Sequence, residues 1–550
     1  MKKIRLQIIS LLCAMFLVGC STESPLANKP NSQDTTVVTP VISGDLVGKI
    51  TVGYQGWFTA QGDKSPENKW GHFNFECWPD VREYEKTYKS SYANLPNGDE
   101  ARSFSAWDQS TVNKHFEWMK TYGIDCAALQ RFTCEISPGS AVKTFRDGIA
   151  TRVKNAAEAY GIKFYIMYDA SGWKDLEAVK ADWKNTITSA SALNLLSSPN
   201  YAKQNGKPVV CIYGLGYTSH PSNALEALDL INWFKAQGCY VVGSCPGQWR
   251  SGTGDSKSDF LETYKAFDMI SGWAVGRTVN ADYTAWITGD RDFCAANKMD
   301  YQPCIYPGTS FYNTNSSTGK NLLPRNHGNF LWSEFAVLRN AGIKTAYVAM
   351  FDEVNEATQI FKTAEDSTQI PAGKWFLTLD ADGVKCSSDF YLRLVNDGGR
   401  MLKGLLPYQG SHPTPHIQRL KPGLVVAIKA VSNNKYVTVG DGTTPLIASK
   451  TEITDAEKFR VVDATNGTIA FQSILNNKYV KSGSTPLIAS SSSIDDEDKY
   501  YEVDGGENYV SIKSYTNNLY VNDDNGGNDP LTAKVTVSGT WRIFIVEVIK

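Results

Sequence analysis

Short runs of apolar residues alternate with longer amphipathic stretches between about residue 47 and residue 425. A short apolar run predicts a buried strand, and apolar residues that recur every three or four positions predict a helix. Four helical stretches, 112–122, 141–160, 224–237 and 330–341, end beside a glycine, which commonly stops a helix. The predicted strands are 50–56, 126–132, 164–170, 208–214, 240–245, 269–275, 301–308 and 345–353.

The recurring order of helix, glycine and strand indicates right-handed crossovers and a parallel sheet. Eight such units fit a (β/α)8 barrel, the TIM barrel fold, which we predict for residues 47–423. The long insert between the first two strands is expected to form loops over the mouth of the barrel. The alternative is an open doubly wound sheet, which often carries a glycine-rich phosphate turn after a strand. No such turn is evident here.

From about residue 424 the chain changes to short strands and turns rich in Asn, Gly and Ser. The sequence Asn-Asn-Lys-Tyr-Val at 433–437 recurs at 476–480 and, with Leu for Lys, at 517–521. Phe459, Tyr500 and Trp541 follow one another at intervals of 41 residues. Three such repeats predict an all-β domain over 424–550, a β-trefoil whose repeated aromatic positions form its core. The region resembles fascin-like and ricin-type trefoils, which implies a carbohydrate-binding module; the alternative is a scaffold without a sugar site.

The N-terminus has the order of a targeting segment. A basic start at 1–5 is followed by a mostly apolar stretch at 6–16, and Leu-Val-Gly then precedes Cys20. This order resembles the signal peptide of a bacterial lipoprotein, residues 1–20, and implies cleavage before Cys20 and lipidation of its thiol. The alternative is an ordinary secretory signal that ends in a chance cysteine. Residues 21–46 lack aromatics and predict a flexible linker, so we expect a lipoprotein of the bacterial outer membrane, at the cell surface or the periplasmic face.

Charge and composition narrow the possible partners. The net charge is −2 with Lys and Arg scattered among the acids, so we expect no nucleic-acid partner, no membrane contact beyond the lipid, and a monomer. Aromatic residues make up 12% of the chain, including 14 Trp, which suits stacking on sugar rings but also suits packing in a core.

Cysteine and histidine usage gives little support for metal or disulfide chemistry. Of the 11 cysteines, nine remain when Cys13 and Cys20 are set aside, and an odd number argues against a complete disulfide framework. The pairs that remain open are Cys77 with Cys134 and Cys239 with Cys245. Two prolines between His412 and His416 exclude a helix that would bring both rings to one face, so we predict a loop, no metal site and no cofactor.

Three carboxylates, Asp352, Glu353 and Glu356, arrive within five residues at the end of the eighth predicted strand. Burying charges costs several kcal/mol each unless they are paired. Two nearby carboxyls suit general acid and base work, of which glycoside cleavage is a common example. The alternatives are a structural salt-bridge cluster or a helix N-terminus that favours acids. On a helical turn, side chains three apart have Cβ atoms about 5–6 Å from each other, and close carboxyls favour retention of configuration.

In a (β/α)8 barrel the catalytic groups lie at the C-terminal ends of the strands. Aromatic rings, amides, guanidinium groups and carboxylates gather at these ends, as in a carbohydrate site, although packing is the alternative for each residue. Asp352 either raises the pKa of Glu353 or caps the turn after the strand, and we favour the cap. The predicted substrate-binding residues are Tyr54, Gln55, Trp57, Arg131, Tyr168, Asp169, Trp249, Arg250, Trp273, Arg277, Phe311 and Asp352.

Residues 353–359, Glu-Val-Asn-Glu-Ala-Thr-Gln, resemble the Glu-x-x-Glu-Gly-Thr-Gln segment of glycoside hydrolase family 99, the endo-acting α-mannosidases and mannanases. Further segments resemble the wider grouping of families 71 and 99. They are residues 54–58, 118–125 with 130–132, 307–311 and 324–328. The resemblance spans most of 50–365 and implies a (β/α)8 barrel. It also implies that Glu353 acts as a base on the sugar 2-hydroxyl, so that a 1,2-anhydro sugar forms. Glu356 would then protonate the leaving oxygen and later activate water.

Two departures bear on the substrate. The Trp-His pair usual between the two family-99 glutamates is Val354-Asn355 here, and the following Gly is Ala357. We therefore expect a retaining glycoside hydrolase acting on an α-linked polysaccharide or glycan, either α-mannan-like or α-glucan-like. The main alternative is a non-catalytic glycan-binding surface lipoprotein on a barrel scaffold. A third reading is a polysaccharide lyase, in which Arg131, Arg250 and Arg277 would clamp a uronic acid.

Overall fold

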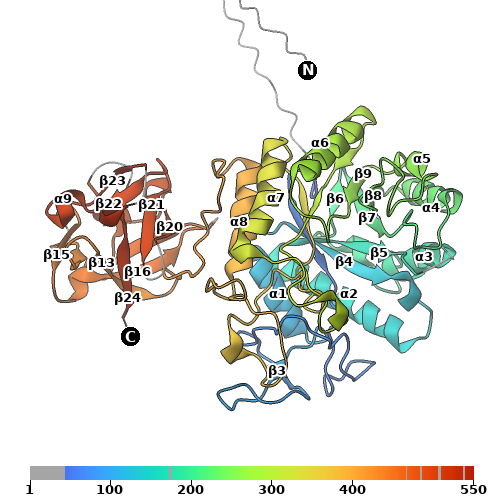
Figure 1. Ribbon diagram of the computed structural model, residues 1–550, viewed down its shortest axis with the longest axis horizontal. Helices are drawn as coiled ribbons and strands as arrows, with labels where there is room; N and C mark the ends of the chain where they lie inside the picture. The colour runs from blue at the N-terminus through green and yellow to red at the C-terminus, as the bar shows by residue number, and fades with distance from the viewer. Residues whose placement is uncertain are drawn as a thin grey trace, which may run out of the picture. The chain divides into compact units, whose positions relative to one another are not determined.

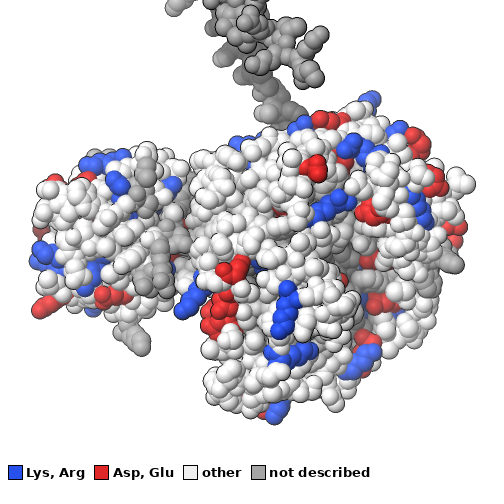
Figure 2. Space-filling view, in the orientation of Figure 1, with Lys and Arg blue, Asp and Glu red and all other residues white. Residues whose placement is uncertain are grey.

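The computed structural model describes residues 44–549 apart from 173–175, 442, 466, 483–485, 506–508 and 537–538. The predicted signal peptide, Cys20 and nearly all of the predicted linker lie outside the described residues. Among the helices of the described part, none combines the length and the apolar character needed to cross a bilayer. Lys and Arg are interspersed with Asp and Glu over the face shown in Figure 2.

Nine strand segments of the described chain pair in parallel along one sheet (Figure 1), and its two outermost segments are consecutive in the chain, which completes a ring. The order around the ring is β10-β9-β8-β7-β5-β4-β1-β12-β11. The strands are β1 (Ile50–Tyr54), β4 (Cys126–Phe132), β5 (Lys163–Asp169), β7 (Lys207–Tyr213), β8 (Tyr240–Cys245), β9 (Met269–Gly272), β10 (Asp300–Tyr301), β11 (Cys304–Ile305) and β12 (Ala346–Val348). A short strand, β6 (Lys203–Gln204), adds to β7 in the antiparallel sense. The predicted (β/α)8 barrel is confirmed.

The seventh strand of the barrel is divided, and this division closes the ring. β10 pairs with β9, whereas β11 pairs with β12, so both ends of the sheet are joined by one stretch of six residues, 300–305. Pro303 lies between the two segments and has no N–H to donate to a neighbouring strand. Its carbonyl still accepts from Tyr347 N–H at 2.9 Å, while Gln302 N–H donates to Ile270 at 2.9 Å.

Helices surround the strands on the outside of the ring (Figure 1). Ser140 caps the second helix by accepting from Lys143 N–H, and Gly161 ends it in the left-handed region, as the sequence predicted. The helices are α1 (Gln109–Thr121), α2 (Ala141–Tyr160), α3 (Glu177–Asp182), α4 (Ala224–Ala236), α5 (Leu261–Tyr264), α6 (Ala281–Ala296), α7 (Asn329–Asn340) and α8 (Phe390–Lys403). The insert after β1 contains only the short pair β2 (Tyr88–Lys89) and β3 (Arg102–Ser103).

The helix α8 was missed by the sequence pattern because it contains two adjacent glycines, which disfavour helix. Both glycines are needed for close packing. A Cβ at Gly398 would lie 2.5 Å from the Phe335 ring, and one at Gly399 would lie 2.8 Å from Ile50. The glycines therefore let α8 approach α7 and β1.

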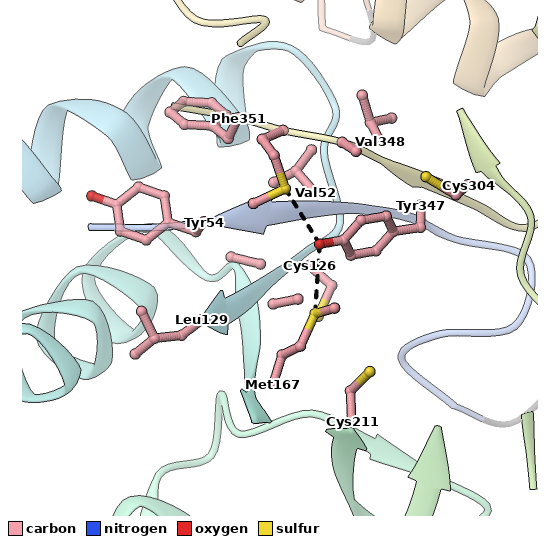
Figure 3. Packing of buried hydrophobic residues seen from close by; sticks show 14 of the residues in the cluster. Val52, Tyr54, Cys126, Leu129, Met167, Cys211, Cys304, Tyr347, Val348 and Phe351 are labelled. Atoms are coloured by element: carbon pink, nitrogen blue, oxygen red, sulfur yellow. Dashed lines mark hydrogen bonds between the residues drawn. The ribbon is translucent and has the colours of Figure 1, made fainter. Parts of the chain in front are cut away.

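Buried aromatic and sulfur groups fill the interior of the barrel (Figure 3). The Tyr347 hydroxyl lies 3.5 Å from the sulfur atoms of both Met167 and Met350, which are weak acceptors. Residues from β1, β4, β5 and β12 thus share one packed layer. The nine described cysteines are all unpaired, so neither candidate disulfide forms, and Cys134 is exposed whereas Cys77 is buried.

The C-terminal region forms a separate antiparallel all-β domain with its own core, which runs from Leu420 to Phe544. Its strands are β13 (Val425–Ala430), β14 (Lys435–Thr438), β15 (Ile447–Lys450), β16 (Lys458–Asp463), β17 (Ile469–Ser473), β18 (Tyr479–Lys481), β19 (Ile488–Ser491), β20 (Tyr500–Asp504), β21 (Val510–Ser514), β22 (Tyr520–Asn522), β23 (Thr532–Val535) and β24 (Phe544–Val548). A short helix, α9 (Asp524–Gly527), follows β22. This arrangement fits the predicted trefoil.

The repeated Asn-Asn pair has one physical role in all three repeats. The first Asn of each pair donates its side-chain amide across the repeat, from Asn433 to Ala448 O (2.8 Å) and equivalently from Asn476 and Asn517. The second Asn of each pair takes a positive φ between 56° and 57°. Asn tolerates this left-handed conformation better than other side chains, which explains why the pair recurs.

One predicted core residue of the trefoil is wrong. Phe459 and Tyr500 are buried, but Trp541 is 49% exposed, and Phe544 fills the equivalent core position with 0% exposure. β24 begins at Phe544, so the last interval is longer than 41 residues and Trp541 is displaced to the surface.

We expect Phe544→Ala to destabilise the protein by about 3–5 kcal/mol, because it empties a fully buried site. Trp541→Ala is expected to change stability by less than about 1 kcal/mol, as for other surface positions. Urea unfolding of the full chain measures both values. Equal losses for the two variants would contradict the assignment of Phe544 to the core.

Candidate active site

The carboxylate segment follows directly from β12. A cis peptide joins Ala349 to Met350, and residues 354–357 then form a turn. Ala357, the last residue of this turn, has a φ of 53°, in the left-handed region. An L side chain there costs about 1–2 kcal/mol, which glycine avoids.

Asp352 connects the end of β12 to the end of β1. The side chain is 1% exposed, and it accepts backbone N–H groups from Gln55 (2.8 Å) and Gly56 (2.9 Å). Burial raises its pKa to about 6, although these two N–H groups act in the opposite direction. Both carboxylate oxygens of Asp352, a predicted substrate-binding residue, hold the neighbouring strand end.

Glu353 is 6% exposed, and its Oε2 accepts from Gln55 Nε2 at 3.1 Å. Burial raises its pKa well above the usual range for a glutamate, and the charge of Glu356 raises it further. The Gln55 hydrogen bond lowers it, and Asp352 adds a smaller increase. Asp352 therefore disfavours ionisation of Glu353, and its carboxylate holds the end of β1 rather than capping the turn after β12.

Glu356 is partly exposed, and burial raises its pKa as well. When two interacting carboxyls are both disfavoured in their ionised form, they bind and release protons as a pair. In the free site the more deeply buried Glu353 holds a proton more firmly than Glu356. Such a pair can act as one acid and one base, which is what acid–base catalysis requires.

Two polar atoms beside the pair have no hydrogen-bond partner within the described protein. They are Gln55 Oε1 and Asn355 Oδ1, and both are buried at the atom level. Buried polar atoms are nearly always satisfied by protein, water or ligand. Asn355 lies between the two glutamates in sequence, and Gln55 Nε2 bonds to Glu353, so both residues adjoin the pair.

An acid and three aromatic rings border the glutamates. The charge of Asp169, at the end of β5, raises the pKa of Glu353, and the charge of Glu356 raises that of Tyr213. Trp273 packs against Tyr213 with ring centroids 5.1 Å apart, and against Tyr347 at 6.3 Å. Asp169 and Trp273 thus lie where the sequence predicted. Tyr347 was missed because it reads as one of several apolar strand residues.

Three predicted substrate residues point outward from the barrel and are buried instead. The Tyr54 hydroxyl bonds to His115 Nδ1 at 2.9 Å. The Arg131 guanidinium donates to Asp182 at 2.6 and 2.7 Å, and the Tyr168 hydroxyl donates to the same Asp182 at 2.8 Å. Side chains alternate along a strand, so the neighbours Gln55 and Asp169 face the site while these three pack under helices. The structure therefore gives all three side chains internal hydrogen-bond partners.

The predicted residues after β8 and β9 also have internal partners. Trp249 is fully buried and donates to Asp290 at 2.8 Å. Arg250 donates to the same Asp290 at 2.9 Å, and Arg277 lies 3.8 Å from Asp255. Both arginines remain partly exposed, but each faces a carboxylate. A lyase would need a free guanidinium to clamp the uronic acid. Arg131 is buried and the other two arginines each face a carboxylate, so none of the three has an unpaired guanidinium.

Trp57 borders a cavity of about 290 Å³ that is also lined by residues of the insert after β1 and of α2. Its ring is stacked between His72 (centroids 3.8 Å apart) and Phe132 (5.3 Å). Arg146 also lines the cavity and donates to Gln55 O at 3.2 Å, so one wall of the cavity is joined to the residue that holds Glu353. Trp70 and His72, which the sequence analysis missed, lie in the insert after β1, where no periodic pattern marked them.

Phe311 is half-buried on the loop after β11. The preceding residues of this loop hold the glutamate turn, since Ser310 N–H donates to Glu356 O at 3.0 Å. The structure offers no metal site at the glutamates: the described His, Cys, Asp and Glu side chains form no group of three or more that would hold an ion.

No protein-family profile matches this chain, and no curated protein matches it either. Among solved structures, it is similar to the GH99 endo-alpha-mannosidase from Bacteroides thetaiotaomicron, with 14% identity over 64% of this chain and 98% of that chain and a TM-score of 0.48. It is also similar to a glycoside hydrolase-like protein, with 13% identity over 65% of this chain and 94% of that chain and a TM-score of 0.38. A ricin B-like lectin from Macrolepiota procera, solved with lactose, is 14% identical over 24% of this chain and 99% of that chain, with a TM-score of 0.21.

We expect Glu353→Gln to stabilise the protein, by an amount of the order of 1 kcal/mol, at pH 8 but not at pH 4.5. A carboxyl whose pKa is raised on folding favours the folded state at low pH, and this contribution is lost as pH rises through the folded pKa. Glutamine removes that penalty at high pH. Urea unfolding at both pH values measures the effect, with the exposed Glu262→Gln as control. A stabilisation that is equal at the two pH values would contradict the buried, protonated Glu353.

Proposed function

We propose that this protein is a retaining glycoside hydrolase that cleaves α-linked bonds in a polysaccharide or glycan, with Glu353 and Glu356 as its catalytic pair. The observation that carries the proposal is the pair itself. Two carboxyls with raised pKa values lie three residues apart at the C-terminal mouth of a (β/α)8 barrel, beside the side chain of Gln55. The partly exposed ring of Trp273 next to them suits stacking on a sugar.

In the proposed first step, Glu353 removes the proton of the sugar 2-hydroxyl, and that oxygen attacks the adjacent anomeric carbon. Glu356 gives its proton to the glycosidic oxygen as the bond to the leaving sugar breaks. In the second step, Glu356 takes a proton from water, which opens the resulting 1,2-anhydro sugar at the anomeric carbon. Glu353 returns its proton to the 2-oxygen. Two inversions at one carbon give net retention.

These roles require the shared proton to be on Glu356 when substrate is bound. In the free site, burial favours the proton on Glu353. A sugar 2-hydroxyl that donates to Glu353 would stabilise its anion, as Gln55 Nε2 does at 3.1 Å. Substrate binding is therefore proposed to move the proton to Glu356 before the bond breaks.

The residues between the glutamates support a substrate that differs from that of family 99. Val354 is fully buried, so of the two residues only Asn355 can meet a sugar. An amide there provides a hydrogen-bond acceptor where the family motif has an aromatic side chain and histidine. We propose that the trefoil binds glycan, and that Cys20 carries the lipid anchor in an outer membrane.

We expect Glu353→Gln and Glu356→Gln to lower the rate on an α-mannan or α-glucan by about 10²–10⁴-fold, because each removes a proton-transfer group. Product release from a panel of both polymers measures the rate, and proton NMR of fresh product reports its anomeric form. The exposed Glu262→Gln should keep full activity. A parent protein that binds these polymers and releases no product would favour the non-catalytic glycan-binding alternative.

We expect His72→Ala to raise KM several-fold for oligosaccharides of four or more units and to leave disaccharide cleavage unchanged. The variant removes a ring from the cavity beside Gln55, and an aromatic contact is worth about 1 kcal/mol. Steady-state kinetics on α-linked oligosaccharides of increasing length measure the effect. The same change in KM at every length would show that the cavity holds no distal sugar.

A further inference from the structure

Glu76, in the insert after β1, carries a fully buried carboxylate outside the catalytic pair. The carboxylate accepts three hydrogen bonds from the loop after β11. Its Oε1 accepts from the Ser310 hydroxyl and from Tyr312 N–H (2.9 Å), and its Oε2 accepts from Asn313 N–H (2.7 Å). A buried carboxylate is strongly destabilising unless its oxygens are satisfied, so this cluster of donors specifies a carboxylate.

The backbone around Glu76 holds the turn that carries the two glutamates. The N–H groups of Glu76 and Cys77 both donate to Val354 O, at 2.8 and 3.0 Å. Val354 is the residue directly after Glu353, so these bonds fix the first half of the turn.

The loop after β11 holds the second half of the same turn. Glu356 O accepts from Ser310 N–H at 3.0 Å and from the Thr309 hydroxyl at 2.8 Å. The Glu76 carboxylate joins this loop to the insert. A closed circuit results, which runs from Glu76 through Val354, Glu356 and Ser310 back to Glu76.

We infer that Glu76 is a positioning residue that sets the separation and orientation of Glu353 and Glu356. It acts through the turn and contacts neither reacting carboxyl in the described structure. The inference rests on the proposed function, because it assigns Glu76 to the geometry of that reaction. A displacement of about 1 Å in a catalytic group can lower a rate 100-fold, so loosening this circuit is costly for catalysis.

The Glu76→Gln variant tests the inference with little change in shape. Its amide can keep the two donors at Oε1, but its NH₂ group then faces Asn313 N–H, so one hydrogen bond is lost. We expect kcat to fall about 10- to 100-fold, KM to stay within about threefold, and the pH–rate profile to shift. Glu76→Asp, which keeps the charge but shortens the reach, should lower kcat less than Glu76→Ala.

Glu334→Gln is the matched control. Glu334 is equally buried on α7 and accepts Tyr306 N–H at 2.9 Å and the Tyr283 hydroxyl at 3.4 Å, but it has no bond to the glutamate turn. We expect its kcat to stay within about twofold of the parent. A Glu76→Gln variant with the same kcat and pH profile as Glu334→Gln overturns the inference.

Hydrogen–deuterium exchange gives a readout that does not depend on turnover. Peptides covering residues 351–358 should exchange faster in Glu76→Gln than in the parent or in Glu334→Gln. Equal exchange in the two variants overturns the inference whatever the activity. A failure of the proposed function is seen separately, as a parent protein that releases no product from any polymer of the panel.

Discussion

The two hydrogen bonds from the backbone of Gln55 and Gly56 to Asp352 are the contact on which the site depends. They join the ends of β1 and β12, the first and last strands of the barrel, at the height where the carboxylates emerge. Gln55 is held by its N–H, and its side chain then reaches Glu353 while its carbonyl accepts from Arg146 of α2. A single buried carboxylate thus aligns a strand end, an amide donor and a helix around the reacting group.

The electrostatics of the site follow from this burial. Asp352 and Glu353 are almost inaccessible to water, and Glu356 is only partly exposed. The hydrogen bonds to Asp352 and Glu353 come from an amide side chain and backbone N–H groups rather than from cations. Ionisation is therefore disfavoured, and the pair holds a proton at pH values where free glutamates would be charged. Such a site lowers the stability of the folded protein at neutral pH, which is a common cost of an active centre. The supports from the insert and from the loop after β11 keep the turn in place despite this cost.

Elsewhere the same residue types have purely structural roles. Side chains alternate between the two faces of a strand, and this alternation decides which polar residues face the site and which pack outside the barrel. Gln55 and Asp169 face the glutamates, whereas Tyr54 and Tyr168, one position earlier, face outward to His115 and Asp182. From the sequence both members of each pair are polar residues at a strand end. Only the direction of the side chain in the closed barrel distinguishes them, and that direction depends on strand tilt and register.

The sequence by itself determined the barrel, the trefoil repeat and the turn with Glu353 and Glu356, because hydrophobic period, glycine stops and repeated turn residues are local properties of the chain. The boundaries of β4, β8 and α2 were predicted to the residue. The tertiary structure alone decided which polar residues meet the pair, that α8 forms around Gly398 and Gly399, and that Phe544 replaces Trp541 in the core. Each of these depends on packing between segments far apart in sequence, and so does the contact of Glu76 with Ser310, 234 residues away. A local pattern carries no information about such distant neighbours.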